Sequence, residues 1–347
     1  MEPSDEARQQ SPLRQIAVLI PAWKPDERLV ELVQALAAAD FAAIVVVDDG
    51  SGEEYERIFA RVRGIPSAVV RRHEQNRGQG CAVKTAAEWV LANLPGVTGA
   101  VTADADGQHA VADIVRVAEA LARSGGRTVL GAREFGDGVP LRSRFGNILT
   151  RYVFRFFSGL AIGDTQSGLR GIPRQWLPEV PRAPGDRFEF AIGFLAHFAQ
   201  IGAAPATIPI ATIYIDGNRS SHFKPVRDSV RIYLLLLRCF AASWLPECID
   251  LAGFAAAWAA GRNMAAAMVA GRLAGVASLA FSLRFARYPR GEAKTSFVRR
   301  VVYLAATGLV AFAAIEALTA DLDWSTMGAK IVVELILYLA LGFMKKL

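Results

Sequence analysis

The chain has 347 residues, and its 39 lysines and arginines against 33 aspartates and glutamates give a formal net charge of +6. Hydrophobic residues make up 52% of it and the mean hydropathy is +0.27, which is high for a soluble protein; the length predicts about two domains. Three cysteines without a CxxC pair and four scattered histidines argue against a zinc site. The basic charge comes with no base-reading motif, which argues against nucleic acid as a partner.

The first part of the chain reads as a polar tail followed by an α/β domain. Residues 1–14 are polar and charged and lack the apolar core of a signal peptide, so we expect the domain that follows to stay in the cytosol. Apolar runs then alternate with helical patterns, which predicts a parallel sheet with helices on both faces. The expected strands are 16–21, 44–47, 67–72, 99–103 and 127–132, and the expected helices are 26–39, 53–63, 81–93 and 111–123.

Charged residues follow several of these strands directly. Asp104 and Asp106 come after strand 99–103, and residues i and i+2 of an extended chain point to the same side, so both carboxylates can converge on one divalent cation. Asp48 and Asp49 follow the second strand and Arg133 the fifth. Ligands of such sheets bind beyond the carboxyl ends of the strands, which predicts a site at this rim.

The next segment is less regular. We expect a helix at 144–158, a polar turn at 164–170 before a short strand, a helix at 186–201, a strand at 207–215 and a flexible loop at 216–222. Residues 223–238 mix arginines and lysine with apolar residues, which predicts a basic amphipathic helix on a membrane surface. The alternative is the cytosolic end of a first spanning helix.

The remainder, 239–347, is rich in alanine, leucine and valine. Four apolar stretches at about 239–260, 264–283, 301–320 and 327–344 predict four transmembrane helices. The arginine-rich loop at 284–300 places both termini in the cytosol. The spacing of Gly271 and Gly275 permits close helix packing within the chain or between copies in a homo-oligomer. Charges within the stretches, such as Arg272, predict either structural ion pairs or a seat for a lipid phosphate.

Four motifs in order carry a family resemblance. They are Ile20-Pro21-Ala22-Trp23, Val47-Asp48-Asp49-Gly50-Ser51, Asn76-Arg77-Gly78-x-Gly80 and Asp104-Ala105-Asp106-Gly107-Gln108. Together they resemble the family 2 glycosyltransferases with the GT-A nucleotide-sugar fold. The segment Asp164–Arg170 is similar to the subgroup of polyprenyl-phosphate glycosyltransferases, which includes dolichol-phosphate mannose synthase, and the last four helices resemble a GtrA-type membrane module. We therefore expect a GT-A domain at 15–222, the interfacial helix at 223–238 and a four-helix membrane domain at 239–347.

The resemblance implies an inverting enzyme that transfers one hexose from a UDP- or GDP-linked sugar to a polyprenyl phosphate, with Mg²⁺ or Mn²⁺ as cofactor. Asp106 and Gln108 would hold the metal, and the nucleotide site would be Pro21, Ala22, Glu27, Asp48, Asp49, Lys84, Asp104 and Ala105. The acceptor phosphate would bind Arg142, Arg144, Arg170 and Arg219. The catalytic set would be Asp104, Asp106, Arg133, Asp164 and Arg219, with Asp164 orienting the acceptor or acting as a base.

Departures from the family pattern keep alternatives open. Trp23-Lys24-Pro25 replaces the usual Tyr-Asn-Glu, and the Gln-x-x-Arg-Trp signature of processive synthases is absent, which argues against repeated elongation. One alternative is another membrane acceptor such as diacylglycerol, which would need a general base. Another is a lipid-carrier flippase or scaffold with an inert catalytic domain. We expect an integral protein of a bacterial or archaeal plasma membrane, with its catalytic domain in the cytoplasm and the bilayer as partner.

Overall fold

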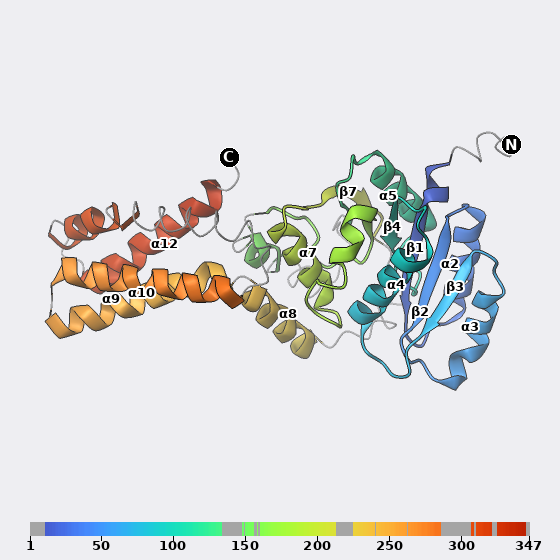
Figure 1. Cartoon of the computed structure of the whole chain (residues 1–347), viewed down its shortest axis with the longest axis horizontal. Coiled ribbons are helices and arrows are strands. Elements are labelled where there is room, and N and C mark those ends of the chain that lie inside the picture. Colours follow the sequence, from blue (N-terminus) through green and yellow to red (C-terminus); the bar gives the residue numbers. More distant parts are fainter. Residues whose placement is uncertain are drawn as a thin grey trace. The chain divides into compact units, whose positions relative to one another are not determined.

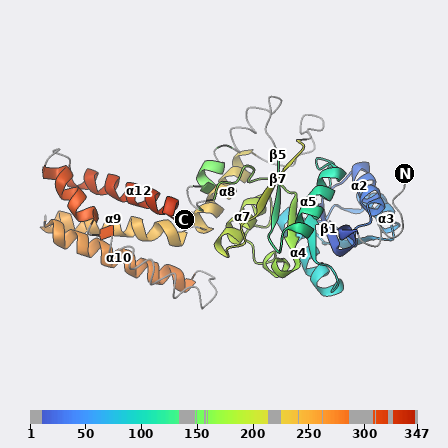
Figure 2. The ribbon, with the colours of Figure 1, turned by 90° about the horizontal axis from the view of Figure 1, so that it is seen from above.

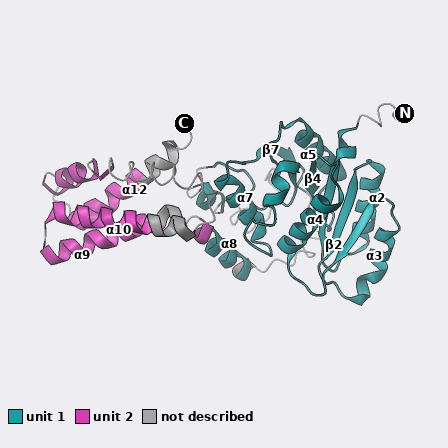
Figure 3. Ribbon diagram, viewed as in Figure 1, with its two compact units in different colours: residues 1–155, 160–236 teal, residues 156–159, 237–347 magenta. Residues whose placement is uncertain are grey.

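The computed structural model separates into two compact units, one of residues 1–155 and 160–236 and the other of 156–159 and 237–347 (Figure 3). The structure describes residues 11–133, 148, 150–155, 158, 160–212, 225–239, 241–261, 263–285, 307–308, 310–320 and 325–344.

The first unit is built on a seven-stranded mixed sheet in the order β3-β2-β1-β4-β6-β5-β7 (Figure 1). The strands are β1 (Ile16–Ala22), β2 (Ala43–Asp48), β3 (Ala68–Arg72), β4 (Gly99–Thr102), β5 (Val129–Arg133), β6 (Arg170–Pro173) and β7 (Ala206–Ile210). The alternating α/β pattern is confirmed. The all-parallel sheet is wrong in one respect, because β6 runs antiparallel to both its neighbours, β4 and β5.

Helices cover both faces of the sheet. They are η1 (Pro12–Gln15), α2 (Glu27–Ala38), η2 (Glu53–Tyr55), α3 (Glu56–Arg63), α4 (Gln79–Asn93), α5 (Val111–Arg123), η3 (Arg174–Glu179) and α7 (Phe190–Gln200). Helix α2 contacts both α3 and α5, whereas α4 contacts α7. Strand β2 is buried along its whole length, as expected for a strand covered on both faces. Figure 2 shows β5 and β7 side by side, and these two strands pair in parallel.

Sheet order explains where a site can form. Strands β1, β2, β4 and β5 run in one direction, so their carboxyl ends lie at one rim, and the amino end of the antiparallel β6 meets them there. Thr102, the last residue of β4, is the register partner of Arg170, the first of β6. The chain before β6 therefore lies at the same rim as the residues that follow β4 and β5.

Helix α8 (Pro225–Cys239) presents two kinds of surface. Ile232 and Leu236 are buried, whereas Val230, Leu234 and Leu237 are 40–55% exposed. Arg227 and Arg238 are also exposed. The helix is thus amphipathic and basic, as its sequence predicts.

The second unit contains α9 (Ala241–Gly261), α10 (Met264–Phe285), a helical stretch at 310–320 and α12 (Thr326–Met344). Helices α9 and α10 pack closely, because a Cβ on Gly271 would lie 2.6 Å from the carbonyl oxygen of Asp250. The expectation of four transmembrane helices is not supported: none of the described helices combines the length and the apolar character needed to cross a bilayer.

Charged side chains interrupt the apolar runs of this unit, which lowers their mean hydropathy. Lys330 is completely buried, and its Nζ donates to Asp250 Oδ1 at 2.7 Å and to Glu334 Oε1 at 2.8 Å. Arg272 pairs with the same two carboxylates, with Nη1 3.0 Å from Asp250 Oδ2. Arg272 thus has the acidic partners expected of a structural ion pair. These four side chains are called the charge cluster below.

Candidate active site

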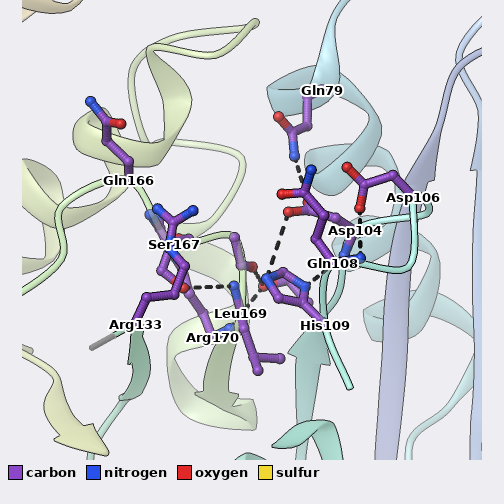
Figure 4. Close-up of polar contacts among 12 residues, drawn as sticks. Gln79, Asp104, Asp106, Gln108, His109, Arg133, Gln166, Ser167, Leu169 and Arg170 are labelled. Atoms are coloured by element: carbon purple, nitrogen blue, oxygen red, sulfur yellow. Dashed lines mark hydrogen bonds and ion pairs between the residues drawn. The ribbon is translucent and has the colours of Figure 1, made fainter. Parts of the chain in front are cut away.

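The candidate site lies at the rim of the sheet and begins with Asp104, which follows β4. Gln79, the first residue of α4, donates from Nε2 to Asp104 Oδ1 at 2.8 Å (Figure 4). The backbone N–H of Asp104 donates to Nδ1 of His109 at 3.1 Å, so the ring proton lies on Nε2, which is 3.7 Å from Asp104 Oδ2. Asp104 is therefore oriented by neighbours on both sides.

Gly168 provides the space in which the Asp104 carboxylate lies. A Cβ built on Gly168 would be 2.6 Å from Oδ2 and 2.7 Å from Oδ1 of Asp104, closer than any real side chain permits. Any larger residue at 168 would displace this carboxylate. The glycine of the 164–170 turn is thus required by a close approach.

Asp106 lies on the same turn as Asp104. Burial, and then the negative charge of Asp104, raise the pKa of the Asp106 carboxyl above its usual value, while a hydrogen bond from the Gln108 N–H to Oδ1 at 3.0 Å opposes this. Two carboxylates that repel one another in a partly buried turn are stabilised by a cation placed between them. This donor set fits Mg²⁺ or Mn²⁺.

The protein alone supplies few ligands for such an ion. No group of three or more His, Cys, Asp or Glu side chains that could hold a metal occurs in the described residues. Mg²⁺ is usually held by one or two carboxylates together with substrate phosphates. Asp106, with Gln108 beside it, matches that mode of binding.

Asp49 is engaged entirely within the protein. Its Oδ1 accepts from the Arg77 N–H at 2.9 Å and lies 2.7 Å from His73 Nδ1, and its Oδ2 accepts from Asn76 at 3.0 Å and from the Gly78 N–H at 2.7 Å. Gly78 has a φ of +106°, and a Cβ there would meet the carbonyl oxygen of Asp186 at 2.3 Å. The carboxylate therefore supports the turn that starts α4.

Asp48 differs from its neighbour. It is equally buried and its Oδ1 accepts from the Ser51 N–H at 2.9 Å. Its Oδ2 lies 3.2 Å from Nε of Arg72 and accepts no hydrogen bond within the described part of the chain. Of the two predicted nucleotide ligands, Asp48 is therefore the one whose carboxylate oxygen, Oδ2, can accept a hydrogen bond from a nucleotide.

Other predicted nucleotide contacts are placed less centrally. Pro21 and Ala22 end β1, beside Val47 and Asp48 of β2, and so lie at the rim, and Ala105 separates the two acidic residues. Lys84 instead donates to the carbonyl of Gly185 at 2.8 Å and to Asp186 at 2.9 Å. Glu27 is exposed and forms an ion pair with Arg61.

Arg133 and Asp164 form a tight pair at the end of β5. Arg133 Nε donates to Oδ2 at 2.7 Å and Nη2 to Oδ1 at 3.2 Å. The Asp164 side chain is 0% exposed, whereas that of Arg133 is 26% exposed. Asp164 is therefore placed to hold Arg133, and its burial does not suit the expected base or acceptor contact.

Arg170 is buried as well. Its Nε donates to the Ser167 carbonyl at 3.1 Å, its Nη2 to the Ala191 carbonyl at 2.6 Å, and its guanidinium lies 4.6 Å from the ring centre of Phe194. Burial lowers its pKa to about 10, so it stays charged at pH 7. This position ties β6 to α7 and does not suit the predicted acceptor contact. Arg142, Arg144 and Arg219 lie outside the described residues.

Sequence reasoning gave no role to several residues of this site. Gln79, Thr102, His109 and Gly168 all contribute to it. Gln79 lies within one of the motifs and His109 directly follows another, so their positions next to motif residues could have indicated a role. The requirement for glycine at 168 could not be predicted, because it depends on the short distance to the Asp104 carboxylate in the folded chain.

The chain is similar to several known proteins. Residues 17–180 match the family described as Glycosyl transferase family 2. An uncharacterized protein of Methanocaldococcus jannaschii is 30% identical over 211 residues, which cover 59% of this chain and 84% of that one. UDP-N-acetylglucosamine–dolichyl-phosphate N-acetylglucosaminyltransferase of Methanococcus voltae is 28% identical over 220 residues, 58% of this chain and 86% of that one.

Solved structures share the fold. Glucosyl-3-phosphoglycerate synthase of Mycobacterium tuberculosis, in complex with Mn²⁺, UDP and glucosyl-3-phosphoglycerate, aligns with a TM-score of 0.51 at 19% identity over 68% of this chain and 82% of that one. The same synthase with Mn²⁺, UDP-glucose and phosphoglyceric acid aligns with a TM-score of 0.51 at 20% identity, over the same shares.

Proposed function

Because the chain belongs to glycosyltransferase family 2, we propose that this glycosyltransferase transfers one hexose from a nucleoside diphosphate sugar to a polyprenyl phosphate. The observation that carries the proposal is the pair Asp104 and Asp106 on one turn at the rim, where Gln79, Gly168 and Gln108 contact the two carboxylates. The similarity to a dolichyl-phosphate N-acetylglucosaminyltransferase supports the acceptor class and favours UDP over GDP in the donor.

The donor would bind across the carboxyl ends of β1, β2 and β4. The Asp48 carboxylate would accept hydrogen bonds from the nucleoside, and Asp104 and Asp106 would face the diphosphate. A Mg²⁺ or Mn²⁺ ion held by Asp106 and Gln108 would offset the charge of the leaving nucleoside diphosphate. The synthase of the same fold that binds Mn²⁺ together with UDP supports this cofactor.

The acceptor would bind on the Arg133 side of the rim. A phosphate monoester has a second pKa near 6 and is mostly ionised at pH 7, so it can attack the anomeric carbon without a general base. What it requires is positive charge, and an arginine stays charged and can bind two phosphate oxygens. Direct attack inverts the anomeric carbon. Arg219, and Arg142 or Arg144, are proposed as further phosphate ligands.

A polyprenyl acceptor requires the enzyme to work at a lipid surface. Moving a polyprenyl chain out of the bilayer costs a free energy of about 0.8 kcal/mol for each CH₂ group. The exposed apolar residues of α8, together with Arg227 and Arg238, support binding to anionic lipid. We therefore propose that the catalytic unit works at the cytoplasmic face of a bacterial or archaeal membrane.

The assay first identifies the donor by thermal shift against UDP- and GDP-sugars with Mn²⁺, because ligands that bind the folded state raise its stability. Undecaprenyl phosphate and diacylglycerol are then offered as acceptors, and the products are identified by mass spectrometry. A sugar found on diacylglycerol alone would contradict the proposed acceptor.

Replacing Asp106 with asparagine is expected to lower kcat by at least about 100-fold, since the variant loses a ligand of the metal ion that would offset the charge of the leaving nucleoside diphosphate. The melting temperature in EDTA should not fall, because burial and the neighbouring Asp104 already disfavour the ionised carboxylate. Gln79→Ala serves as the milder comparison, because it removes only a neighbour of Asp104. Normal turnover by the Asp106 variant would rule out this assignment.

A further inference from the structure

One turn of the chain contacts both halves of the proposed site. The turn, Asp164–Gly168, precedes the antiparallel strand β6, and β6 lies between β4 and β5. Asp104 follows β4 and Arg133 ends β5. Figure 4 shows Arg133 on one side of the segment Gln166–Arg170 and Asp104 on the other. We call Asp164–Gly168 the rim turn.

The start of the rim turn holds Arg133. In addition to the two bonds from the guanidinium, the Arg133 N–H lies 3.3 Å from Asp164 Oδ2, and the Gln166 N–H donates to Oδ1 at 3.0 Å. These donors fix the orientation of the buried Asp164 carboxylate. The two hydrogen bonds from the Arg133 guanidinium to this carboxylate then fix the orientation of the guanidinium.

The end of the rim turn holds Asp104. The carbonyl of Gly168 accepts from Thr102 Oγ1 at 2.5 Å, and that hydroxyl oxygen accepts from the Arg170 N–H at 3.1 Å. The Gly131 N–H donates to the Leu169 carbonyl at 2.9 Å. Gly168 is thus fixed to β4, and its neighbour Leu169 to β5, at the point where the Asp104 carboxylate lies against Gly168.

We propose that the rim turn sets the position of the acceptor-binding arginine relative to the donor-binding carboxylates. Asp164 is a positioning residue that acts through Arg133, and Gly168 leaves the space that Asp104 requires. This inference rests on the proposed function, which assigns the donor to Asp104 and the acceptor to Arg133. It replaces the base role for Asp164 with an orienting one.

A double-mutant cycle separates these two roles. Asp164→Asn and Arg133→Gln are measured singly and together, with undecaprenyl phosphate varied at saturating donor and Mn²⁺. We expect Asp164→Asn to raise the acceptor KM between about 10-fold and 100-fold, the scale of a misplaced binding group, and to leave the donor KM within about twofold. In the Arg133→Gln background the same change should have no further effect. Effects that multiply would overturn the inference, because a base acts independently of the arginine.

A matched variant controls for the loss of a buried carboxylate. Asp113 is also buried, pairs with Arg116 and accepts from the Ala211 N–H at 2.8 Å, and it contacts neither Arg133 nor the rim turn. Asp113→Asn should lower the melting temperature comparably and leave the acceptor KM unchanged. An equal rise in KM for both variants would show a general loss of structure and contradict the positioning role.

The other end of the turn is tested without any acceptor. Gly168→Ala should weaken Mn²⁺-dependent UDP binding by at least about tenfold in calorimetry, because the new Cβ displaces Asp104. Gly163→Ala is the control, since a Cβ there meets nothing within 4 Å. Unchanged UDP affinity in a folded Gly168→Ala variant would overturn this half of the inference.

The two proposals fail in different ways. A wild-type enzyme that binds Mn²⁺ and UDP but makes no lipid product would overturn the proposed function. An active wild type in which Asp164 and Arg133 act independently would overturn the rim turn alone.

Discussion

Asp48 and Asp49 are adjacent and equally buried, yet their oxygens are used differently. All the hydrogen-bonding partners of Asp49 belong to the protein, whereas Asp48 Oδ2 keeps capacity for a ligand. Neighbouring residues of the same type can therefore serve stability and binding separately.

We predict that the asparagine variant of Asp49 loses stability, whereas that of Asp48 loses affinity for the donor. Asp49→Asn places an amide against backbone N–H donors and should lower the free energy of unfolding by about 1–3 kcal/mol. Asp48→Asn keeps the acceptor for Ser51 and should mainly raise the donor KM. Urea unfolding and donor titration distinguish the two, and an Asp48 variant that loses stability while keeping its donor KM would contradict the assignment.

At this scale the sequence was informative about position and less so about partners. It placed Asp104 and Asp106 on one turn at the carboxyl end of a strand. It could not separate Asp48 from Asp49, or give Asp164 and Arg170 their buried roles, since these depend on contacts with residues far away in the chain, such as Arg133 and Ala191.

At the scale of elements, α9, α10 and α12 are linked by the charge cluster, whose charges also act on Glu247 of α9. Burial, and then the charge of Glu334, raise the pKa of Glu247 to about 7, although Arg272 and Lys330 oppose this. Asp250 contributes a further negative charge nearby. The folded unit thus favours protonated Glu247.

This predicts a pH-dependent stability of α9. Because the folded pKa lies above the ordinary one, the stabilising contribution of the proton is complete below about pH 4.5 and is lost as the pH rises through about 7. Glu247→Gln, which mimics the protonated form, should therefore protect the α9 amides from hydrogen exchange at pH 8 by roughly 3 kcal/mol at most, and by little at pH 5. Glu316→Gln, at an exposed position, is the control. A gain that does not change with pH would contradict the prediction.

Element positions were predictable where the apolar pattern was long. Strands β1 to β5 and helices α2 to α5 lie close to their expected ranges. The antiparallel direction of β6 was not predictable, because its four residues, Arg-Gly-Ile-Pro, carry no signal of orientation. The apolar stretches after residue 239 predicted α9, α10 and α12, but the charged residues within them lower the hydropathy, and none of the described helices is apolar enough to span a membrane.

At the scale of the whole molecule, the proposed binding to a lipid surface depends on the net charge and on the exposed face of α8. The double change Arg227→Glu and Arg238→Glu should weaken binding to vesicles containing phosphatidylglycerol by about tenfold or more, at roughly 1 kcal/mol per lost basic residue. The control exchanges two exposed arginines elsewhere, Arg123 and Arg182, for glutamate. Vesicle binding is measured by cosedimentation. An equal loss of binding in both double variants would show that net charge alone, and not the surface of α8, causes the effect.

The ion pair between Arg133 and Asp164 joins the two ends of a long connection, residues 134–163. Since both ends are already held at fixed points of the sheet, the entropy of bringing the ends of this connection together depends only weakly on its length. The connection can therefore change in length, by evolution or by engineering, while β5 and β6 stay in register.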